Sequence, residues 1–320
     1  MTSHHDFEVW KEIATRCSKF DLKDGTGRHT QFSIDWSSRV VYEEKCRNLY
    51  NSPSLLLAAG ITLFEFEHAH VCPVAVEATD GDTRASTYDH IILRTLHEIF
   101  MVANLASPGS FNLSRSYLRD PTLDPQKNPL AQTELELNEY LFENAWHNGK
   151  DMPWLKVDFL TFNQVFSWYQ SLDMRQRNSA SAPVERTLLC LLHLAKTAFM
   201  EQSATLWIAS ALEAFFDTPS GKSFSFLCAR ITALLGLSSA ESNELRKKLR
   251  AFFDVRHAFI HGGSDVWHPV LDEKDKKLDK AVTDLLFLND FACSILVGCM
   301  QELIRRNWKG IRFEENIYPA

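Results

Sequence analysis

The chain has 320 residues and a mass of 36.7 kDa, with 45% hydrophobic and 23% charged residues. This mixture is typical of a globular protein and excludes a disordered, collagen-like or low-complexity chain. The net charge of −7 excludes a surface that is basic throughout, although it leaves room for a local basic patch. Since single hydrophobic cores rarely outgrow ~250–300 residues, the length predicts two domains.

The acidic excess lies in the first part of the chain. Residues 1–181 contain 17 basic and 24 acidic residues, whereas residues 182–320 contain 17 of each. We therefore expect the two parts to face different partners.

The cysteines and the apolar runs indicate the cellular compartment in which the protein functions. Seven cysteines occur without a Cys-x-x-Cys pair, and several stand in apolar runs, which indicates free buried thiols in a reducing cytosol. The first ten residues lack the apolar core of a signal peptide. Residues 281–300 are apolar but include Asp284, Asn289 and Asp290, which makes them too polar to span a membrane. The sequence predicts a cytoplasmic protein in which this run is a core helix.

Residues 1–175 mix strand-like and helical patterns, which predicts an α+β domain. Residues 31–42 and 61–77 are rich in β-branched and aromatic residues and predict strands. Helical spacing predicts helices over 87–105, 131–147 and 158–172. Four prolines predict a long loop or hairpin connection over residues 107–129.

The polar, small residues 176–183 end in a proline and predict a linker. Beyond it, helices are predicted over residues 184–199, 203–216, 224–235, 238–261 and 277–305. The fourth begins with Ser238 and Glu241 in the pattern of a capping box, and Gly262 and Gly263 end it. Residues 184–320 therefore predict an all-α helical bundle.

One charged residue, Arg256, interrupts the apolar face of the fourth of these helices. On a helical wheel it lies near the middle of a stripe, predicted to be buried, that consists of Leu245, Leu249, Phe252, Phe259 and Ile260. Burying an arginine without a partner is costly, so the position requires one. One interpretation is snorkelling, or a structural ion pair to a bundle neighbour such as Glu213. The other is that the stripe faces a second subunit or a ligand anion such as phosphate.

His261 follows Arg256 by five residues and stands beside the glycine pair. Histidine titrates near neutral pH and can carry a proton next to an anion that an arginine binds. An ideal helix, however, places these two side chains about 140° apart. Either the helix end relaxes, or a second copy of the chain supplies one of the two groups.

Residues 256–261, Arg-His-Ala-Phe-Ile-His, resemble the R-x4-H motif of HEPN domains. Residues 206–216, LWIASALEAFF, resemble the second-helix segment of the Apea-like HEPN branch, in which the His-Gly ending is also typical. The resemblance covers residues 184–305. It implies a helical bundle that commonly pairs as a homodimer, so that two motifs form one cleft. It also implies a metal-independent endoribonuclease without a cofactor, of the kind found in toxin–antitoxin, abortive-infection and other antiviral systems.

The resemblance also assigns roles to residues. His261 would be the general acid/base, Arg256 would bind the scissile phosphate, and His257 would take the auxiliary polar position. We infer that Glu213 orients Arg256. RNA carries its own nucleophile, so the enzyme needs only to move two protons and stabilise the charged phosphorane.

Four basic residues lie earlier on the same predicted helix: Arg246, Lys247, Lys248 and Arg250. One interpretation is that they guide an RNA backbone toward the cleft. The other is a solvated basic face without a ligand.

Several histidines could belong to other kinds of site. Asp254, His257 and His261 share one face of the predicted helix and, with His268, could bind a divalent metal. His68 and His70 share a strand face without a third ligand, and His90 and His97 share a helix face and fit packing or surface roles.

Two functions of different classes follow. In the first, the protein is a ribonuclease effector, and residues 1–175 sense a trigger, restrain the nuclease or bind a regulatory or phage-derived protein. In the second, the bundle is a non-catalytic HEPN module for dimerisation or RNA binding.

Overall fold

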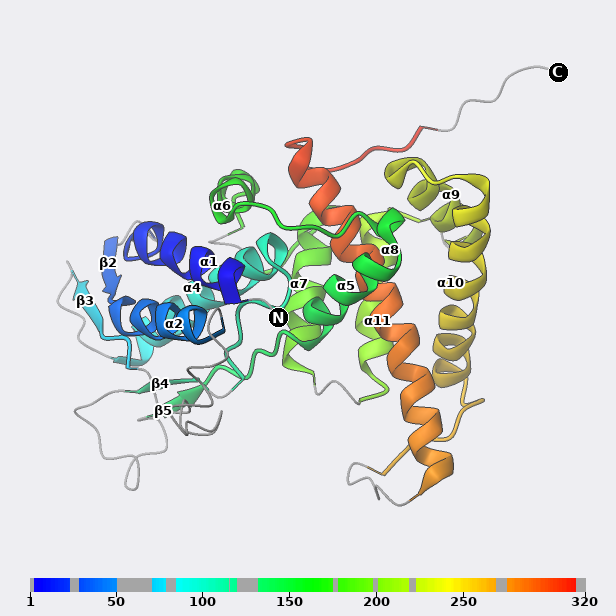
Figure 1. Cartoon of the computed structure of the whole chain (residues 1–320), viewed down its shortest axis with the longest axis horizontal. Coiled ribbons are helices and arrows are strands. Elements are labelled where there is room, and N and C mark those ends of the chain that lie inside the picture. The colour runs from blue at the N-terminus through cyan, green and yellow to red at the C-terminus, as the bar shows by residue number, and fades with distance from the viewer. Residues whose placement is uncertain are drawn as a thin grey trace.

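The structure is a computed structural model that describes residues 3–23, 29–50, 71–78, 85–114, 116–119, 132–174, 178–197, 201–218, 223–268 and 275–314. Helices make up 65% of it, and a small antiparallel sheet lies near the N-terminus. An α+β first part followed by a helical second part, as predicted, is compatible with this arrangement. The sheet lies at the opposite end of the molecule from the last helices (Figure 1).

The first part begins with two helices beside a three-stranded sheet. The helices are α1 (Ser3–Arg16) and α2 (Ser37–Tyr50), and the strands, antiparallel in this order, are β1 (Lys19–Lys23), β2 (His29–Ile34) and β3 (Val74–Ala78). Phe20 and Phe32 stack between β1 and β2 with their ring centroids 4.7 Å apart. The Trp36 indole N–H donates to the Cys17 carbonyl at 2.8 Å, which ties the start of α2 to the end of α1.

Helices α4 to α6 and a second small sheet complete this part. They are α4 (Ala85–Ala106), β4 (Tyr117–Arg119), β5 (Gln132–Glu134), α5 (Tyr140–Asp151), the 3-10 helix η3 (Pro153–Leu155) and α6 (Phe162–Ser171). β4, inside the connection predicted over residues 107–129, pairs with β5 in antiparallel fashion. The helices predicted over residues 87–105 and 158–172 are confirmed as α4 and α6.

Several predictions for the first part were wrong. Residues 31–42 are a strand only as far as Ile34 and continue as α2, which packs against α1. The β-branched and aromatic residues at positions 40–42 suit a strand locally, but tertiary packing overrides that preference. Residues 132–134 are β5, so the helix predicted from residue 131 begins only at Tyr140. The strand predicted over residues 61–77 is confirmed at its end, where residues 74–77 belong to β3, whereas residues 61–70, with His68 and His70, lie outside the described residues.

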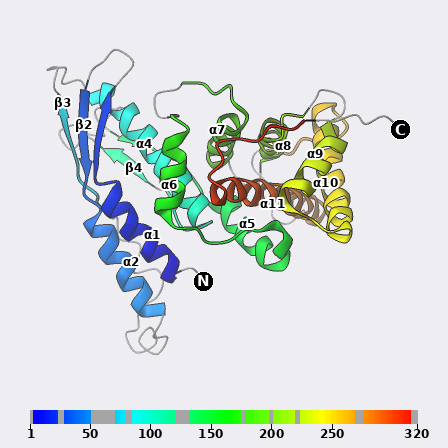
Figure 2. The same ribbon diagram turned by 90° about the horizontal axis from the view of Figure 1, so that it is seen from above.

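All five helices predicted after residue 183 are present. They are α7 (Pro183–Lys196), α8 (Ala204–Phe215), α9 (Ser223–Leu235), α10 (Ser239–Ile260) and α11 (Lys276–Arg305). Seen from above, α11 runs between α5 on one side and α7 and α8 on the other (Figure 2).

α11 is the central helix of the molecule. Among the described residues it is the one helix long and apolar enough to cross a membrane, yet 72% of its apolar window is buried inside the protein. From Asn289 to Ile304 every residue is buried. A helix that is buried on all sides fits the core helix predicted for residues 281–300.

The buried apolar side chains form one cluster that extends from Val9 to Ile304. α5 and η3, which precede the predicted linker, pack along α11, which follows it. The core therefore contains side chains from both sides of residues 176–183. The division into two domains at that linker stays a prediction.

Two glycines allow the segment around η3 to approach its neighbours closely. A Cβ atom at Gly298 on α11 would overlap the Leu155 carbonyl oxygen, and a Cβ atom at Gly149 on α5 would lie 2.8 Å from the Val157 Cβ. Beside them the rings of Trp154 and Phe291 meet edge to face, with centroids 6.1 Å apart. The backbone of residues 155–157 thus lies directly on both helices.

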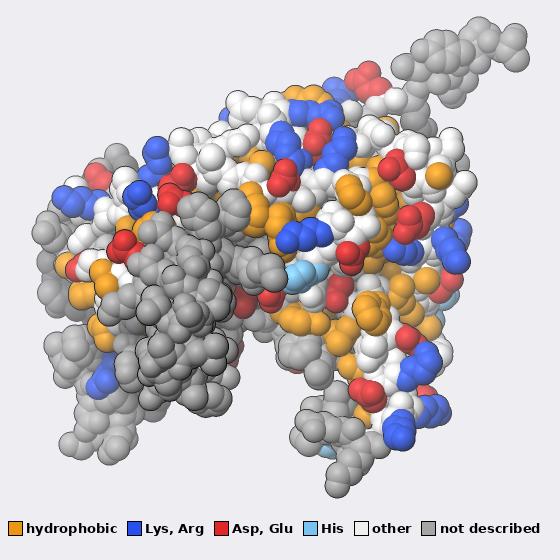
Figure 3. Space-filling model, in the orientation of Figure 1, with side chains coloured by type: hydrophobic (Ala, Val, Ile, Leu, Met, Phe, Trp, Pro, Cys, Tyr) orange, Lys and Arg blue, Asp and Glu red, His pale blue; other side chains and the backbone are white. Residues whose placement is uncertain are grey.

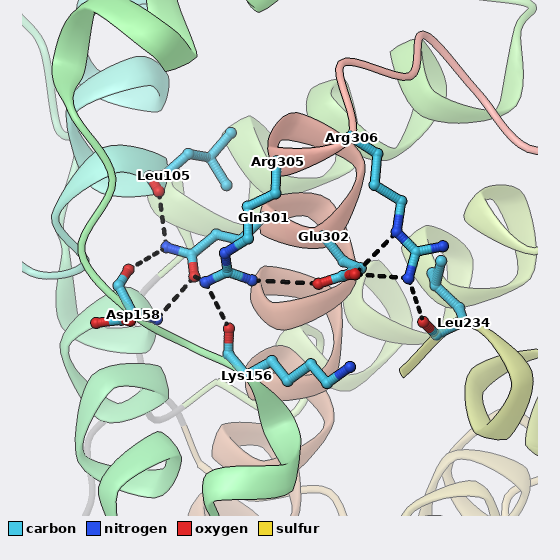
Figure 4. A network of polar contacts seen from close by, with 8 residues as sticks. All are labelled: Leu105, Lys156, Asp158, Leu234, Gln301, Glu302, Arg305 and Arg306. Carbon is cyan, nitrogen blue, oxygen red and sulfur yellow. Dashed lines mark hydrogen bonds and ion pairs between the residues drawn. The ribbon is translucent and has the colours of Figure 1, made fainter. Parts of the chain in front are cut away.

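The amide of Gln301 joins three parts of the chain (Figure 4). It is fully buried, and its Nε2 donates to the carbonyl oxygens of Leu105 at 2.9 Å and Asp158 at 2.6 Å. Its Oε1 accepts from the Asp158 backbone N–H at 2.8 Å. Arg305 donates to the Lys156 carbonyl at 3.0 Å. The end of α4 and the segment after η3 are thereby fixed to α11.

Glu302 extends this junction toward α9. Its carboxylate lies 2.6 Å from Arg306 and 3.4 Å from Arg305, and Arg306 also donates to the Leu234 carbonyl at the end of α9 (Figure 4). The C-terminal end of α11 is therefore bonded to three other elements.

A buried acid lies where α5 meets α11. Asp290 is 8% exposed, and its Oδ1 is buried without a hydrogen-bond partner among the described residues. Burial raises the pKa of Asp290 to about 6, and the Asn144 amide on α5 lowers it by less. Close by, the Asn148 amide donates to the Ser294 hydroxyl at 3.0 Å, which connects the two helices.

Asp290→Asn is expected to stabilise the protein at neutral pH and not in acid. The folded pKa of about 6 lies above the ordinary 3.8, so the folded state holds the proton more tightly than the unfolded state. The contribution of this group to stability therefore falls as the pH rises from about 4 to 6, and above pH 6 its full cost is present. We expect a gain of roughly 1–3 kcal/mol at pH 7.5 and almost none at pH 3, where the carboxyl is protonated in both states. Urea unfolding at both pH values measures it, with Asp284→Asn, exposed on the same helix, as the control. An equal change at both pH values would contradict the assignment.

Candidate active site

Both ends of α10 have the predicted caps. The Ser238 Oγ accepts from the Glu241 backbone N–H at 3.4 Å, and the Glu241 carboxylate accepts from the Ser238 N–H at 2.7 Å, which confirms the capping box. At the other end Gly262 has φ +70° and the Gly263 N–H donates to the Ala258 carbonyl at 2.7 Å. This pattern ends the helix and leaves His261 as its C-terminal capping residue.

The apolar stripe of α10 is buried only as far as Phe252. Leu245, Leu249 and Phe252 are fully buried, but none of residues 253–261 is, and Ile260 is 46% exposed. The prediction that Arg256 lies in the middle of a buried stripe was therefore wrong for the last turns of the helix. These turns extend past the core cluster, so Arg256 lies at its edge.

Arg256 is paired with Glu213 of α8, one of the alternatives that the sequence left open. The guanidinium Nη2 lies 3.8 Å from the Glu213 Oε1, and both side chains are about one-third exposed. At this distance the two groups form an ion pair without a hydrogen bond, and pairs this exposed contribute at most about 1 kcal/mol. The Arg256 Nε is buried and has no hydrogen-bond partner in the described parts of the chain. Because the side chain is still 30% exposed and the pair with Glu213 uses no hydrogen bond, the outer nitrogens of the guanidinium can donate to a further anion.

His257 and His261 lie side by side at the end of α10. Both are exposed, and their ring centroids are 4.3 Å apart with the planes tilted by 48°. The His261 backbone N–H donates to the His257 carbonyl at 3.0 Å. Arg256 instead contacts α8, so the arginine and the histidine pair make separate contacts within one chain. That a second copy brings the two kinds of group together stays a prediction.

Sequence reasoning missed Gln202, in the turn that leads into α8. Its Nε2 donates to the Asp265 carbonyl at 2.9 Å, and its Oε1 accepts from the Trp267 backbone N–H at 3.2 Å. These partners lie 63 and 65 positions after Gln202 in the sequence, and no local sequence pattern predicts a contact at that separation.

The four basic residues of α10 point in different directions. Lys248 is half-buried, lies 2.9 Å from Glu244 and stands over the Phe291 ring of α11 at 5.1 Å. The Arg250 guanidinium lies 3.9 Å from the Phe224 ring centroid of α9. Arg246 and Lys247 are exposed. On the face shown in Figure 3, acidic and basic side chains are interspersed over this region, which favours the solvated-face interpretation for part of the set.

The metal site considered for α10 is not formed. Among the residues that the structure describes, no three His, Cys, Asp or Glu side chains are grouped so that they could hold a metal ion. Asp254, His257, His261 and His268 are among those residues.

His97 and the cysteines lie in surroundings that fit structural roles. Burial, with Lys196 and Arg94 nearby, lowers the pKa of His97 to about 4, so this histidine is neutral at pH 7 and fits a packing role. The six described cysteines are free, as predicted: Cys17, Cys72, Cys190, Cys228, Cys293 and Cys299. Burial raises the pKa of the Cys228 thiol to about 11, which keeps it unreactive.

A scan against protein-family models and searches of curated proteins and of solved structures found no match to this chain. The functional argument therefore depends on the residues of α8 and α10 themselves.

Proposed function

We propose that this protein is a cytoplasmic, metal-independent endoribonuclease of the HEPN type, a toxin or antiviral abortive-infection effector. The observation that carries the proposal is the arrangement of Arg256 at the edge of the core. Glu213 orients the guanidinium from 3.8 Å, while its Nε remains unpaired. An arginine held in this way, followed one and five positions later in the sequence by two exposed histidines, suits an anion that undergoes proton transfer.

In the proposed reaction the 2′-oxygen of RNA attacks the adjacent phosphorus, and the bond from phosphorus to the 5′-oxygen breaks. One His261 removes the proton of the 2′-OH, and a second donates a proton to the departing 5′-oxygen. Arg256 binds the phosphate and stabilises the charge that grows on it, and His257 is the auxiliary polar group. The products are a 2′,3′-cyclic phosphate and a 5′-hydroxyl.

The proposal includes a homodimer, because the reaction uses two histidines and two-fold symmetry supplies the second one. Two exposed apolar side chains flank His261 in sequence and support a contact there: Ile260 is 46% exposed and Val266 is 79% exposed. Residues 1–175 are proposed to sense the trigger or to bind a regulatory protein.

Cleavage of RNA by the purified protein in EDTA tests the proposal. We expect RNA to be cut in EDTA with 2′,3′-cyclic phosphate ends, and the all-deoxy strand of the same sequence to resist because it lacks the nucleophile. Arg256→Ala is expected to abolish the cleavage and to relieve toxicity in an expressing cell. Its matched control is Arg312→Ala, an arginine whose side chain is 89% exposed outside the bundle helices. Cleavage that requires a divalent metal, or that cuts DNA equally well, would overturn the proposal.

The second candidate is a non-catalytic HEPN module for dimerisation or RNA binding. The Arg256–Glu213 ion pair favours it, because the pair gives the arginine a structural partner within one chain. In that case Arg256→Ala weakens folding or RNA binding, and no RNA is cut by the wild-type protein with or without a metal.

A further inference from the structure

We propose that Gln202 is a positioning residue for the motif formed by Arg256 and His261. Its side-chain amide forms hydrogen bonds to the segment that follows α10. These bonds fix the position of His261 relative to Arg256. The inference rests on the proposed function, because it assigns a task within the same site.

Two hydrogen bonds connect the Gln202 side chain to the backbone of this segment. The Gln202 amide donates to the Asp265 carbonyl at 2.9 Å and accepts from the Trp267 N–H at 3.2 Å. A carboxamide has one acceptor and one donor group side by side, so it pairs with the backbone as a neighbouring strand would. Both partners are main-chain groups, so the two hydrogen bonds fix the path of the backbone rather than the side chains of residues 265 and 267.

α8 and the turn that leads into it thereby contact the motif at both ends. Glu213, near the end of α8, lies beside Arg256, and Gln202, about three helical turns earlier, holds the segment beyond His261. The arginine is therefore paired with α8, and the segment after the histidine is bonded to the turn joined to the start of α8. A shift of the segment against α8 changes the place of His261 relative to Arg256.

His261 needs such support because its own surroundings are weak. It is exposed, it caps the C-terminal end of the helix, and its ring lies against the ring of His257, which is itself exposed. Gly262 and Gly263 follow, and glycine permits many backbone conformations. Helix ends of this kind open readily unless something beyond them is fixed. The bonds of Gln202 connect the segment after the glycines to the turn that leads into α8.

The test compares two variants with a matched control. Gln202→Leu removes both hydrogen bonds while it keeps a side chain of similar size. Gln202→Glu keeps the acceptor for Trp267 but places a carboxylate against the Asp265 carbonyl oxygen. Gln170→Leu makes the same change on the exposed side of α6. We expect Gln202→Leu to lower kcat about 10–100-fold, because a displacement of ~1 Å at a catalytic group costs rates of this size. KM should change less than about threefold, since the Arg256–Glu213 pair is untouched. Gln202→Glu should be intermediate, and Gln170→Leu should equal the wild type.

A second readout needs no catalysis. In the free protein, Gln202→Leu should speed hydrogen exchange of the Trp267 amide and shift the NMR signals of the His257 and His261 rings, with little effect on buried core amides. Wild-type kcat in Gln202→Leu, or unchanged histidine ring signals, would overturn the inference while the proposed function stands. A wild-type protein that cuts no RNA would count against the proposed function, and the histidine signals would then decide the positioning role alone.

Discussion

Replacing His261 by alanine is expected to lower kcat for RNA cleavage by about 10²–10⁴-fold, the range that general acid–base catalysis contributes. His257→Ala is expected to lower it much less, because the proposal gives His257 only an auxiliary role. The two rings lie 4.3 Å apart and both are exposed, so the comparison separates catalysis from a general effect of removing an imidazole. Both variants should fold normally, since exposed substitutions usually change stability by less than about 0.5 kcal/mol.

Single-turnover cleavage in EDTA measures this difference, with circular dichroism to establish that each variant is folded. His147→Ala, which removes an exposed histidine on α5, is the control and should cleave at the wild-type rate. Equal losses in His257→Ala and His261→Ala would contradict the assigned roles, and a fully active His261→Ala would remove the proposed mechanism.

Gly298→Ala is expected to destabilise the protein by about 3 kcal/mol or more, at the upper end of overpacking changes. The added Cβ would overlap the Leu155 carbonyl oxygen, which is backbone and cannot rotate away as a side-chain tip can. To accept it, η3 must move off α11, and the packing of Trp154 on Phe291 moves with it. Chemical and thermal unfolding both measure the loss.

Gly310→Ala is the matched control for this change. A Cβ there meets only the Val184 Cγ2, at 4.0 Å, which is an ordinary contact. We expect its unfolding midpoint to stay near that of the wild type. A Gly298→Ala protein as stable as the wild type would show that η3 does not rest on α11 in solution.

The helices after residue 183 could be predicted closely because their signals are local. Ser238, Glu241 and Gly262 mark the ends of α10 within a few residues of where they act. The ion pair of Arg256 with Glu213 could be named in advance as well, since a charged residue on an apolar stripe demands a partner from a neighbouring helix.

The first part of the chain could be predicted less well, because its elements depend on distant contacts. α1 carries a mixed polar pattern and was not predicted, and α2 contains residues that favour strands. Gln202 and Gly298 have roles that exist only once segments far apart in sequence meet. No spacing rule within one element reveals such contacts.

The polar junction at Gln301 has a consequence for the order of events during synthesis. Its partners Leu105 and Asp158 lie 196 and 143 positions earlier, so the bonds form only after Gln301 itself has left the ribosome. α11 also supplies the continuous buried run from Asn289 to Ile304 around which the other helices pack. α8 and α10 thus emerge before the helix that supports them, and contacts at such long separation form slowly. A nascent chain carries Arg256 and His261 before α11 has completed its core, so any activity that needs both in place begins only once α11 has been synthesised and packed.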